Sequence, residues 1–89
     1  MFQKSRIAQT SVGGAINNSL VLAKHTNDDV RLMVCNNDQT IKVYSVPTMN
    51  LVTTLNYTFA VNNVGVSPDG SKMAVVGDCN QINLHSIST

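Results

Sequence analysis

The residue types of a hydrolytic triad come close together near the carboxy terminus, where His85 and Ser86 follow Asp78. In a serine hydrolase such residues supply a nucleophile, a general base and an acid that orients the base. His85 and Ser86 are neighbours in a segment that alternates like a β-strand, so their side chains point to opposite faces. The Gly-x-Ser-x-Gly turn that exposes a catalytic serine is absent, and the chain contains no glutamate that could act as a general acid. We therefore expect no catalytic residues and no enzyme activity, and we interpret His85 as a packed side chain.

The chain also carries residue types that bind metal ions, but their spacing forms no known site. Cys35, Cys79, His25 and His85 could supply a zinc set, yet no two of them stand in a Cys-x-x-Cys or His-x-x-x-His pair. The aspartates do not follow the spacing of a calcium-binding loop. No glycine-rich phosphate or dinucleotide motif is present. The sequence therefore predicts no metal and no cofactor.

Composition limits the kinds of partner and the cellular compartment that we expect for this chain. The 89 residues carry a net charge of +1, and the basic residues are scattered, so no nucleic acid and no membrane surface is expected as a partner. No apolar run approaches the roughly 18 residues of a membrane span. The amino terminus lacks the apolar stretch of a secretory signal, and two cysteines are too few for a disulfide framework. These features predict an intracellular protein with free thiols, in the cytoplasm or the nucleus.

The elements that would position these side chains are revealed by an internal repeat. The segment 15–18 (Ala-Ile-Asn-Asn) returns 45 residues later as 60–63 (Ala-Val-Asn-Asn). The segment 40–46 returns 41 residues later as 81–87, and a longer loop at 23–29 in the first unit accounts for the different spacing. A period of this length, with four short strands per unit, is typical of a β-propeller blade.

Alternating and β-branched residues predict strands throughout, and no helix. Continuous apolar runs at 32–35 and 73–76 indicate strands that are covered on both faces. Ser67-Pro68-Asp69-Gly70 predicts a tight turn, and 36–39 and 78–80 predict hairpin connections. The expected strands are 3–9, 15–22, 30–35 and 40–46 in the first unit and 50–56, 60–66, 72–77 and 81–87 in the second.

The residues of these units resemble the WD40 repeat family. The segment 60–70 is similar to the first strand of that repeat and its Ser-Pro-Asp-Gly turn, and 38–45 is similar to its Asp-Gly-Thr-Ile-x-Leu-Trp-Asp segment. The resemblance covers essentially the whole chain. The segments 16–19, 35–38, 66–70 and 76–78 also resemble those of uncharacterised fungal and plant WD-repeat proteins. That narrower set has no established biochemical activity, so the resemblance points to none in particular.

The resemblance implies an all-β fold of two four-stranded antiparallel blades of a partial propeller. Blade one would span about 3–46 and blade two about 50–87, within a single unit of 1–89. Several signature residues of the family are replaced: Tyr44 and His85 stand where its tryptophan is usual, and Ser45 and Ser86 replace its aspartate. The buried hydrogen-bond network of the family is therefore incomplete in both units.

The function that the resemblance implies is that of a non-catalytic scaffold module for protein–protein interaction. Its candidate binding surface is the loop face that would carry Asn37, Asp38, Phe59, Asn62 and Asn80. Phe59 could anchor a partner, although packing between the blades is the interpretation we favour for it.

Two other functions also fit the sequence. The chain could be a purely structural piece of a propeller whose binding site lies in absent blades, or a small enzyme, which ranks last. Two blades leave two faces uncovered, so we expect a fragment of a larger propeller, a truncated product, or a unit that associates with copies of itself through those faces. The sequence identifies no particular partner.

Overall fold

The protein is built from β-strands alone in the part of the chain that the structure describes. The structure is a computed structural model, and it describes residues 4–6, 8–26 and 29–87. The absence of helices agrees with the all-β prediction. The seven strands are β1 (Asn17–Thr26), β2 (Asp29–Asn36), β3 (Thr40–Val46), β4 (Leu51–Asn56), β5 (Val61–Val66), β6 (Lys72–Gly77) and β7 (Asn83–Ser86).

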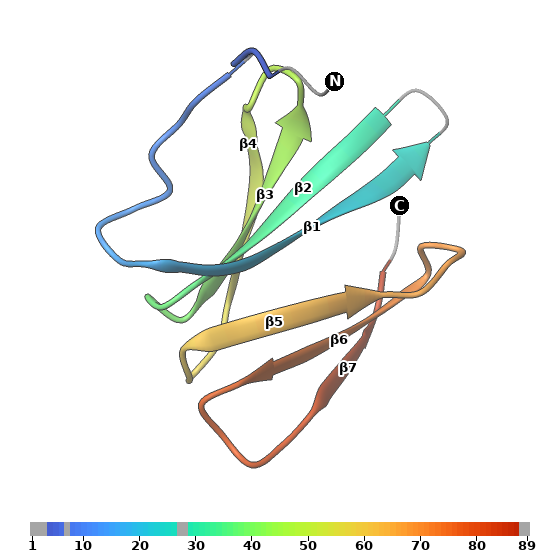
Figure 1. The fold of residues 1–89 in the computed structure, drawn as a ribbon. Helices are drawn as coiled ribbons and strands as arrows, with labels where there is room; N and C mark the ends of the chain where they lie inside the picture. Colours follow the sequence, from blue (N-terminus) through green and yellow to red (C-terminus); the bar gives the residue numbers. More distant parts are fainter. Residues whose placement is uncertain (1–3, 7, 27–28, 88–89) are drawn as a thin grey trace.

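The strands form two antiparallel sheets in which each strand pairs with the next along the chain (Figure 1). The first sheet has the order β1-β2-β3-β4 and the second has the order β5-β6-β7. Short connections explain this order, because antiparallel neighbours need only a tight turn between them.

Two predicted turns are present and have clear local causes. In the β2–β3 connection the side-chain oxygen of Asn36 accepts a hydrogen bond from the backbone N–H of Asp38 at 2.9 Å, and Gln39 adopts a positive φ of 73°. In the β5–β6 connection the N–H of Gly70 donates to the carbonyl of Ser67 at 2.9 Å, and Gly70 has a φ of 75°. Glycine adopts that conformation without steric cost, which fixes the turn at this position.

The division of the chain into sheets differs from the prediction at two points. Strand β4 hydrogen-bonds to β3, so it completes the first sheet instead of opening the second unit at residue 50. The physical reason is a tight reversal, in which the N–H of Met49 donates to the carbonyl of Ser45 at 2.8 Å and brings β4 back along β3.

The expected strand over 3–9 is wrong for the described residues 4–6 and 8–9, which belong to no strand. Residues 3 and 7 lie outside the described part. The second sheet begins with β5 and ends with β7, so it has three strands, and the expectation of two four-stranded sheets is wrong in this respect.

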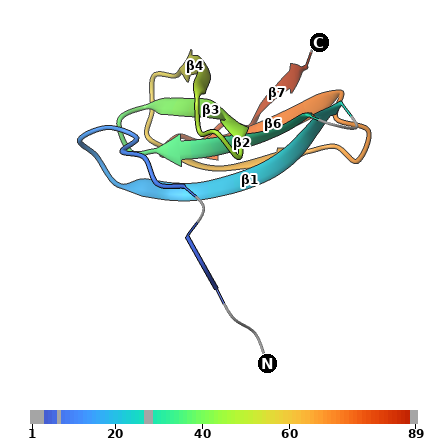
Figure 2. The same cartoon turned by 90° about the horizontal axis from the view of Figure 1, so that it is seen from above.

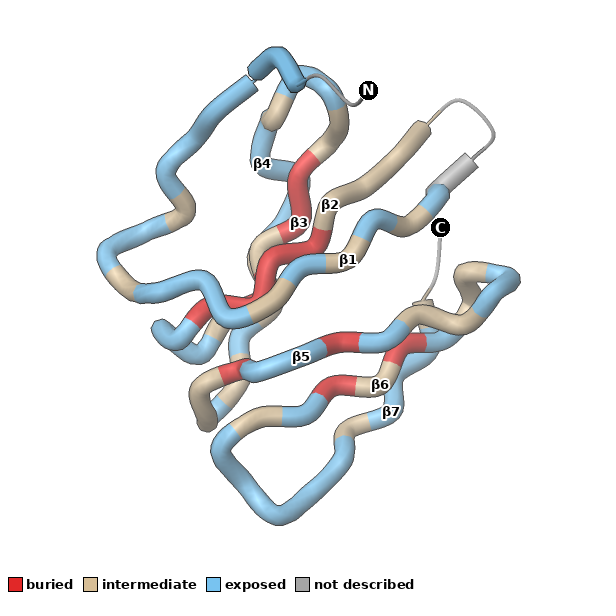
Figure 3. Tube along the Cα trace, in the orientation of Figure 1, coloured by how far each residue is buried: buried red, intermediate tan, exposed pale blue. Residues whose placement is uncertain are grey.

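The sheets pack face to face, and the first strands of each, β1 and β5, lie side by side. The core lies between the sheets and draws on β2, β3, β5 and β6 (Figure 3). From above, β1 lies at one side of the molecule and the last strands, β4 and β7, lie at the other (Figure 2). The buried core residues are Met33, Cys35, Ile41, Val43, Val61, Val64, Met73 and Val75.

The strand pairing shows which residues of the two sheets correspond. The pair Met33–Val43 of the first sheet recurs as Ala74–Leu84 in the second, which keeps the predicted 41-residue spacing. The β1–β2 pair and the β5–β6 pair each have an irregular register at the same place, between Asn17 and Ser19 in the first and between Val61 and Asn63 in the second. In this register Asn18 and Asn62, which are 44 residues apart, occupy equivalent positions in the repeat. The predicted spacing of 45 residues between segments 15–18 and 60–63 is therefore one residue too long.

Candidate functional site

One end of the molecule is rich in amide side chains, and it contains most of the predicted loop face. The side-chain nitrogen of Asn18 donates to the carbonyl of Val61 at 2.9 Å and lies 3.3 Å from Asn37 Oδ1 and 3.4 Å from Asn62 Oδ1. Ser19 Oγ donates to Asn63 Oδ1 at 2.9 Å. The two sheets are therefore joined by polar contacts between β1 and β5 at this end.

Asn18 is the residue that sequence analysis missed here. It gathers Asn37 and Asn62, two of the five predicted residues, around a single amide group. A signal for its importance was the Asn17-Asn18 pair, because the second unit contains a similar pair, Asn62-Asn63. Its role depended on the placement of one sheet against the other, which local sequence does not encode.

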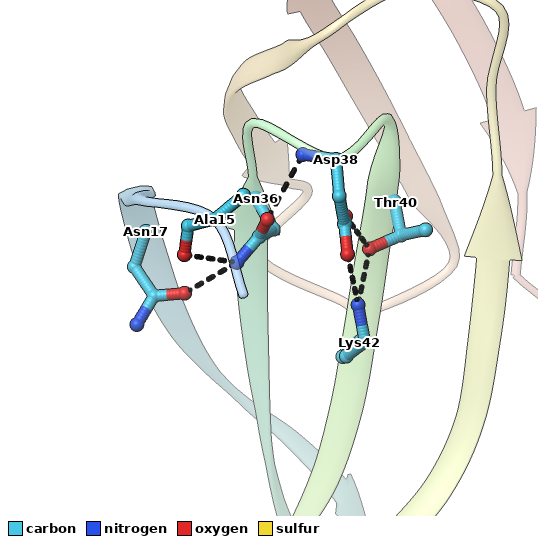
Figure 4. A network of polar contacts seen from close by, with 6 residues as sticks. All are labelled: Ala15, Asn17, Asn36, Asp38, Thr40 and Lys42. Atoms are coloured by element: carbon cyan, nitrogen blue, oxygen red, sulfur yellow. Dashed lines mark hydrogen bonds and ion pairs between the residues drawn. The ribbon is translucent and has the colours of Figure 1, made fainter. Parts of the chain in front are cut away.

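The buried amide of Asn36 connects the amino-terminal segment to the β2–β3 hairpin (Figure 4). Its side chain has no exposed surface. The amide nitrogen donates to Asn17 Oδ1 at 2.8 Å and to the Ala15 carbonyl at 3.4 Å, while the amide oxygen accepts from the Asp38 N–H. A buried amide that is satisfied in this way holds local structure, and it presents nothing to a partner.

Asp38 lies in the same region but is already paired. Its carboxylate accepts a hydrogen bond from Lys42 Nζ at 2.8 Å and another from the Thr40 hydroxyl (Figure 4). These contacts, with Lys42 first, lower the pKa of Asp38. The charge of Asp38 is therefore balanced within the hairpin.

Phe59 is half-buried and packs against the core. Its ring centroid lies 5.4 Å from that of Tyr57, and the ring covers the backbone of Gly77 so closely that a Cβ there would overlap it. The predicted Asn80 is exposed, and Asn62 donates to Asp78 Oδ1 at 2.9 Å. The structure thus brings Asn37 and Asn62 together, while Phe59 lies against its own chain.

The residues considered for catalysis and metal binding have other partners. His85 is exposed, so the interpretation of it as a packed side chain is wrong, and its Nε2 lies 3.4 Å from the Tyr57 hydroxyl. Asp78 accepts from Asn62. Burial raises the pKa of Cys35 to about 11, so this thiol is protonated at neutral pH, whereas Cys79 is exposed. Among the residues that the structure describes, no three His, Cys, Asp or Glu side chains gather to hold a metal ion. The side chain of His25 lies outside the described part. Within the same residues there is no helix of the length and apolarity that a membrane crossing needs.

A groove of about 890 Å³ opens between the sheets toward β4 and β7, and its lining runs along β4 from Val52 and continues to Tyr57. Its apolar lining comes from both sheets, and the Tyr57–His85 pair adds hydrogen-bonding groups. Burial raises the pKa of Tyr57, so its hydroxyl keeps its proton. We call this space the interstrand groove, and its apolar lining comprises Ala23, Met33, Val43, Val52, Leu55, Val66, Met73 and Ile87.

The strands that border the interstrand groove are the edge strands of their sheets. Strand β4 is the last strand of the first sheet, and β7 is the last of the second. An edge strand has one row of backbone N–H and C=O groups without a neighbouring strand, and such a row can pair with an added strand. The groove therefore combines an apolar lining with backbone hydrogen-bonding groups on both sides.

Polar side chains at the mouth of the groove are held in defined positions. Arg31, which lines the groove, pairs with Asp29 at 2.8 Å. Asp69 accepts from Ser67 Oγ at 2.7 Å and from the N–H and hydroxyl of Ser71 at 3.0 and 2.8 Å. These bonds lower the pKa of Asp69 to about 2, so it is ionised at neutral pH.

Comparison with known proteins adds no assignment to this geometry. No family model, no curated protein and no solved structure matches the chain.

Proposed function

We propose that this chain is a non-catalytic protein-interaction module of the WD40-repeat type, and that it binds an extended segment of a partner protein in the interstrand groove. The resemblance of segments 38–45 and 60–70 to WD40 repeats and the antiparallel pairing of the strands support the class. The repeated cross-strand pairs support it as well, because the same unit recurs in both sheets. The proposal includes an intracellular location, which follows from the charge and cysteine content.

The single observation that carries the binding proposal is the interstrand groove itself. Ligand sites in proteins are concave and mostly apolar, with a few polar groups that fix orientation, and about 300–1,000 Å³ is their usual size. The groove, at about 890 Å³, has this size and lining. An extended peptide would pair its backbone with β4 or β7 and place alternate side chains on the lining residues beside these edge strands, Val52, Leu55 and Ile87.

The amide-rich end supports binding less well than the groove. Its amides hydrogen-bond to one another between the sheets, and Asp38 is paired with Lys42. A partner would have to replace bonds that already exist, which reduces the net gain from each new contact. The groove offers surface that has no such partner among the described residues.

The test is selection of a random-peptide phage library on the full chain, followed by affinity measurement with the selected synthetic peptides. Val52 lies half-exposed in the groove, so Val52→Glu adds a charge there with little effect on folding. We expect affinity to fall at least about tenfold, since burying an unpaired charge costs more than 1.4 kcal/mol. The matched control Asn37→Glu places the same charge at the amide-rich end and should bind normally.

The outcomes separate the two surfaces. Peptides with alternating apolar residues that bind wild type and Asn37→Glu equally, and Val52→Glu weakly, support the groove. Peptides that lose affinity for Asn37→Glu and keep it for Val52→Glu would place the site at the amide-rich end and overturn the groove proposal. A selection that yields no peptide with measurable affinity would also overturn it.

A further inference from the structure

Each sheet has a packed face, which lies against the other sheet, and a free face, which points away from it. The internal repeat relates the packed face of one sheet to the free face of the other. On the packed face of the first sheet, all four central residues are buried in the core. Their counterparts, 41 residues later, lie on the face of the second sheet that points away from the first. The buried set is Met33, Cys35, Ile41 and Val43, and the counterparts are Ala74, Val76, Ile82 and Leu84.

The counterparts on the second sheet are apolar but uncovered. Ile82 and Leu84 expose 73% and 70% of their surface, Val76 exposes 38%, and Ala74 is half-buried. The apolar run at 73–76 predicted a strand covered on both faces, yet only Met73 and Val75 are buried. We call Ala74, Val76, Ile82 and Leu84 the free face of the second sheet. Its residues are apolar like those of the internal interface, but no sheet packs on them among the described residues.

In the first sheet it is the outward-pointing residues that correspond to packed residues of the second sheet. Its outward-pointing residues are Leu20, Leu22, Leu32 and Val34, which we call the free face of the first sheet. Leu20 and Leu22 expose 63% and 61% of their surface, whereas Leu32 is half-buried and Val34 is buried, so the exposed part of this face lies on β1. In the strand register these four residues correspond to Val64, Val66, Met73 and Val75, which form the packed face of the second sheet.

The free face of the first sheet is also hollowed. A recess of about 340 Å³ is lined by Leu20, Leu32 and Val34, together with Thr10 and Val12 from the amino-terminal segment. The recess lies beside the exposed Leu20 and Leu22, on the surface that the repeat equates with a packed interface.

We propose that the free face of the second sheet binds the free face of the first sheet in another copy of this chain, head to tail, and so repeats the internal interface. Each free face corresponds to one side of the interface that already exists within the chain, so the occupant that fits both is the chain itself. None of the eight side chains is charged. Five of them are exposed, namely Leu20, Leu22, Val76, Ile82 and Leu84, and exposed apolar side chains that gather on one face mark an interaction site. The contact is separate from the interstrand groove and does not depend on the proposed peptide binding.

A head-to-tail contact uses two different surfaces, so it continues from copy to copy until a ring closes. Because each chain supplies two sheets, rings of about four, six or eight sheets would contain two, three or four chains. Sedimentation velocity and light scattering of the full chain should therefore show a mass well above the 9.6 kDa protomer that falls on dilution. A protomer mass at every soluble concentration would overturn the proposal.

The decisive experiment mixes two charged variants. Leu20→Glu blocks one free face and Leu84→Glu blocks the other, and both positions are exposed enough to accept the charge in a folded protein. Each variant alone should sediment at the protomer mass. A mixture should form a species of twice that mass and no larger, because one intact copy of each face remains.

Other results count against the head-to-tail contact. If either variant alone keeps the mass of the wild type, its face is not part of the contact. If both are monomeric and the mixture stays monomeric, the faces do not bind each other. Val52→Glu, which alters the groove, should associate like wild type, and Leu84→Glu should still bind the selected peptides. The two proposals can therefore fail independently.

Discussion

Replacement of Asn36 tests whether the buried amide stabilises the amino-terminal segment and the β2–β3 hairpin together. Asn36→Ala removes two short hydrogen bonds, one to Asn17 Oδ1 at 2.8 Å and one from the Asp38 N–H at 2.9 Å, and a longer one to the Ala15 carbonyl. A hydrogen bond contributes about 1 kcal/mol net, and the cavity left by a fully buried side chain adds to the loss. We expect the free energy of unfolding to fall by about 2–3 kcal/mol.

The measurement is urea denaturation followed by far-ultraviolet circular dichroism, with linear extrapolation to water. All variants are compared at one protein concentration, since self-association would add to the apparent stability. Asn37→Ala is the matched control, because Asn37 is exposed and its only side-chain bond in the described residues is 3.3 Å long. It should change the free energy by no more than about 0.5 kcal/mol.

A double-mutant cycle gives the result that would refute this reasoning. Asn17→Ala alone removes the 2.8 Å partner of Asn36 and should cost about 1 kcal/mol. Because the same bond is lost in Asn36→Ala, the double variant should cost less than the sum, with a coupling of about 1 kcal/mol. Additive costs, or an Asn36→Ala variant as stable as Asn37→Ala, would show that the buried amide does not hold these segments together.

Two further predictions concern backbone packing and pH. Gly77→Ala should destabilise the protein by at least about 2 kcal/mol in the same urea assay, because its Cβ would overlap the Ala60 carbonyl and the Phe59 ring; an unchanged midpoint would contradict the close approach. The pKa of Asp69 is lowered from 3.8 to about 2, so its carboxylate contributes stability that is full above pH 4 and is lost as pH falls through 2. Thermal unfolding of Asp69→Asn should therefore depend less on pH between 4 and 2 than that of wild type, and equal pH dependence would count against it.

Local features of the fold could be predicted from the sequence. Strands β3 and β6 match the expected ranges 40–46 and 72–77 residue for residue. The turn at Ser67–Gly70 also formed as predicted, because proline, aspartate and glycine each favour a fixed backbone geometry there. Such elements depend on neighbours within a few residues, so the chain specifies them without reference to the rest of the fold.

Features that depend on the arrangement of strands could not be predicted in the same way. The pairing of β4 with β3 follows from the reversal at 47–50, whereas the repeat alone assigned β4 to the next unit. The strand pairing relates β1 to β5 by 44 residues, whereas an alignment of the two Asn-Asn segments gives 45, because the segments are similar without occupying the same positions in the sheets. The interstrand groove lies between two sheets, so no single segment of sequence carries its signature.

The two equivalent asparagines show how neighbouring sheets determine side-chain contacts. Asn18 and Asn62 occupy the same position in the repeat, beside the same irregularity. Each contacts the β-hairpin of its own sheet, Asn18 through Asn37 and Asn62 through Asp78. Asn18 also donates across to the Val61 carbonyl of β5. Their flanking residues differ, since Asn17 and Ser19 correspond to Val61 and Asn63, and among the described residues only Asn18 has a second sheet beside it, which accounts for its additional contact. A copy packed on the free face of the second sheet would give Asn62 the surroundings that Asn18 already has.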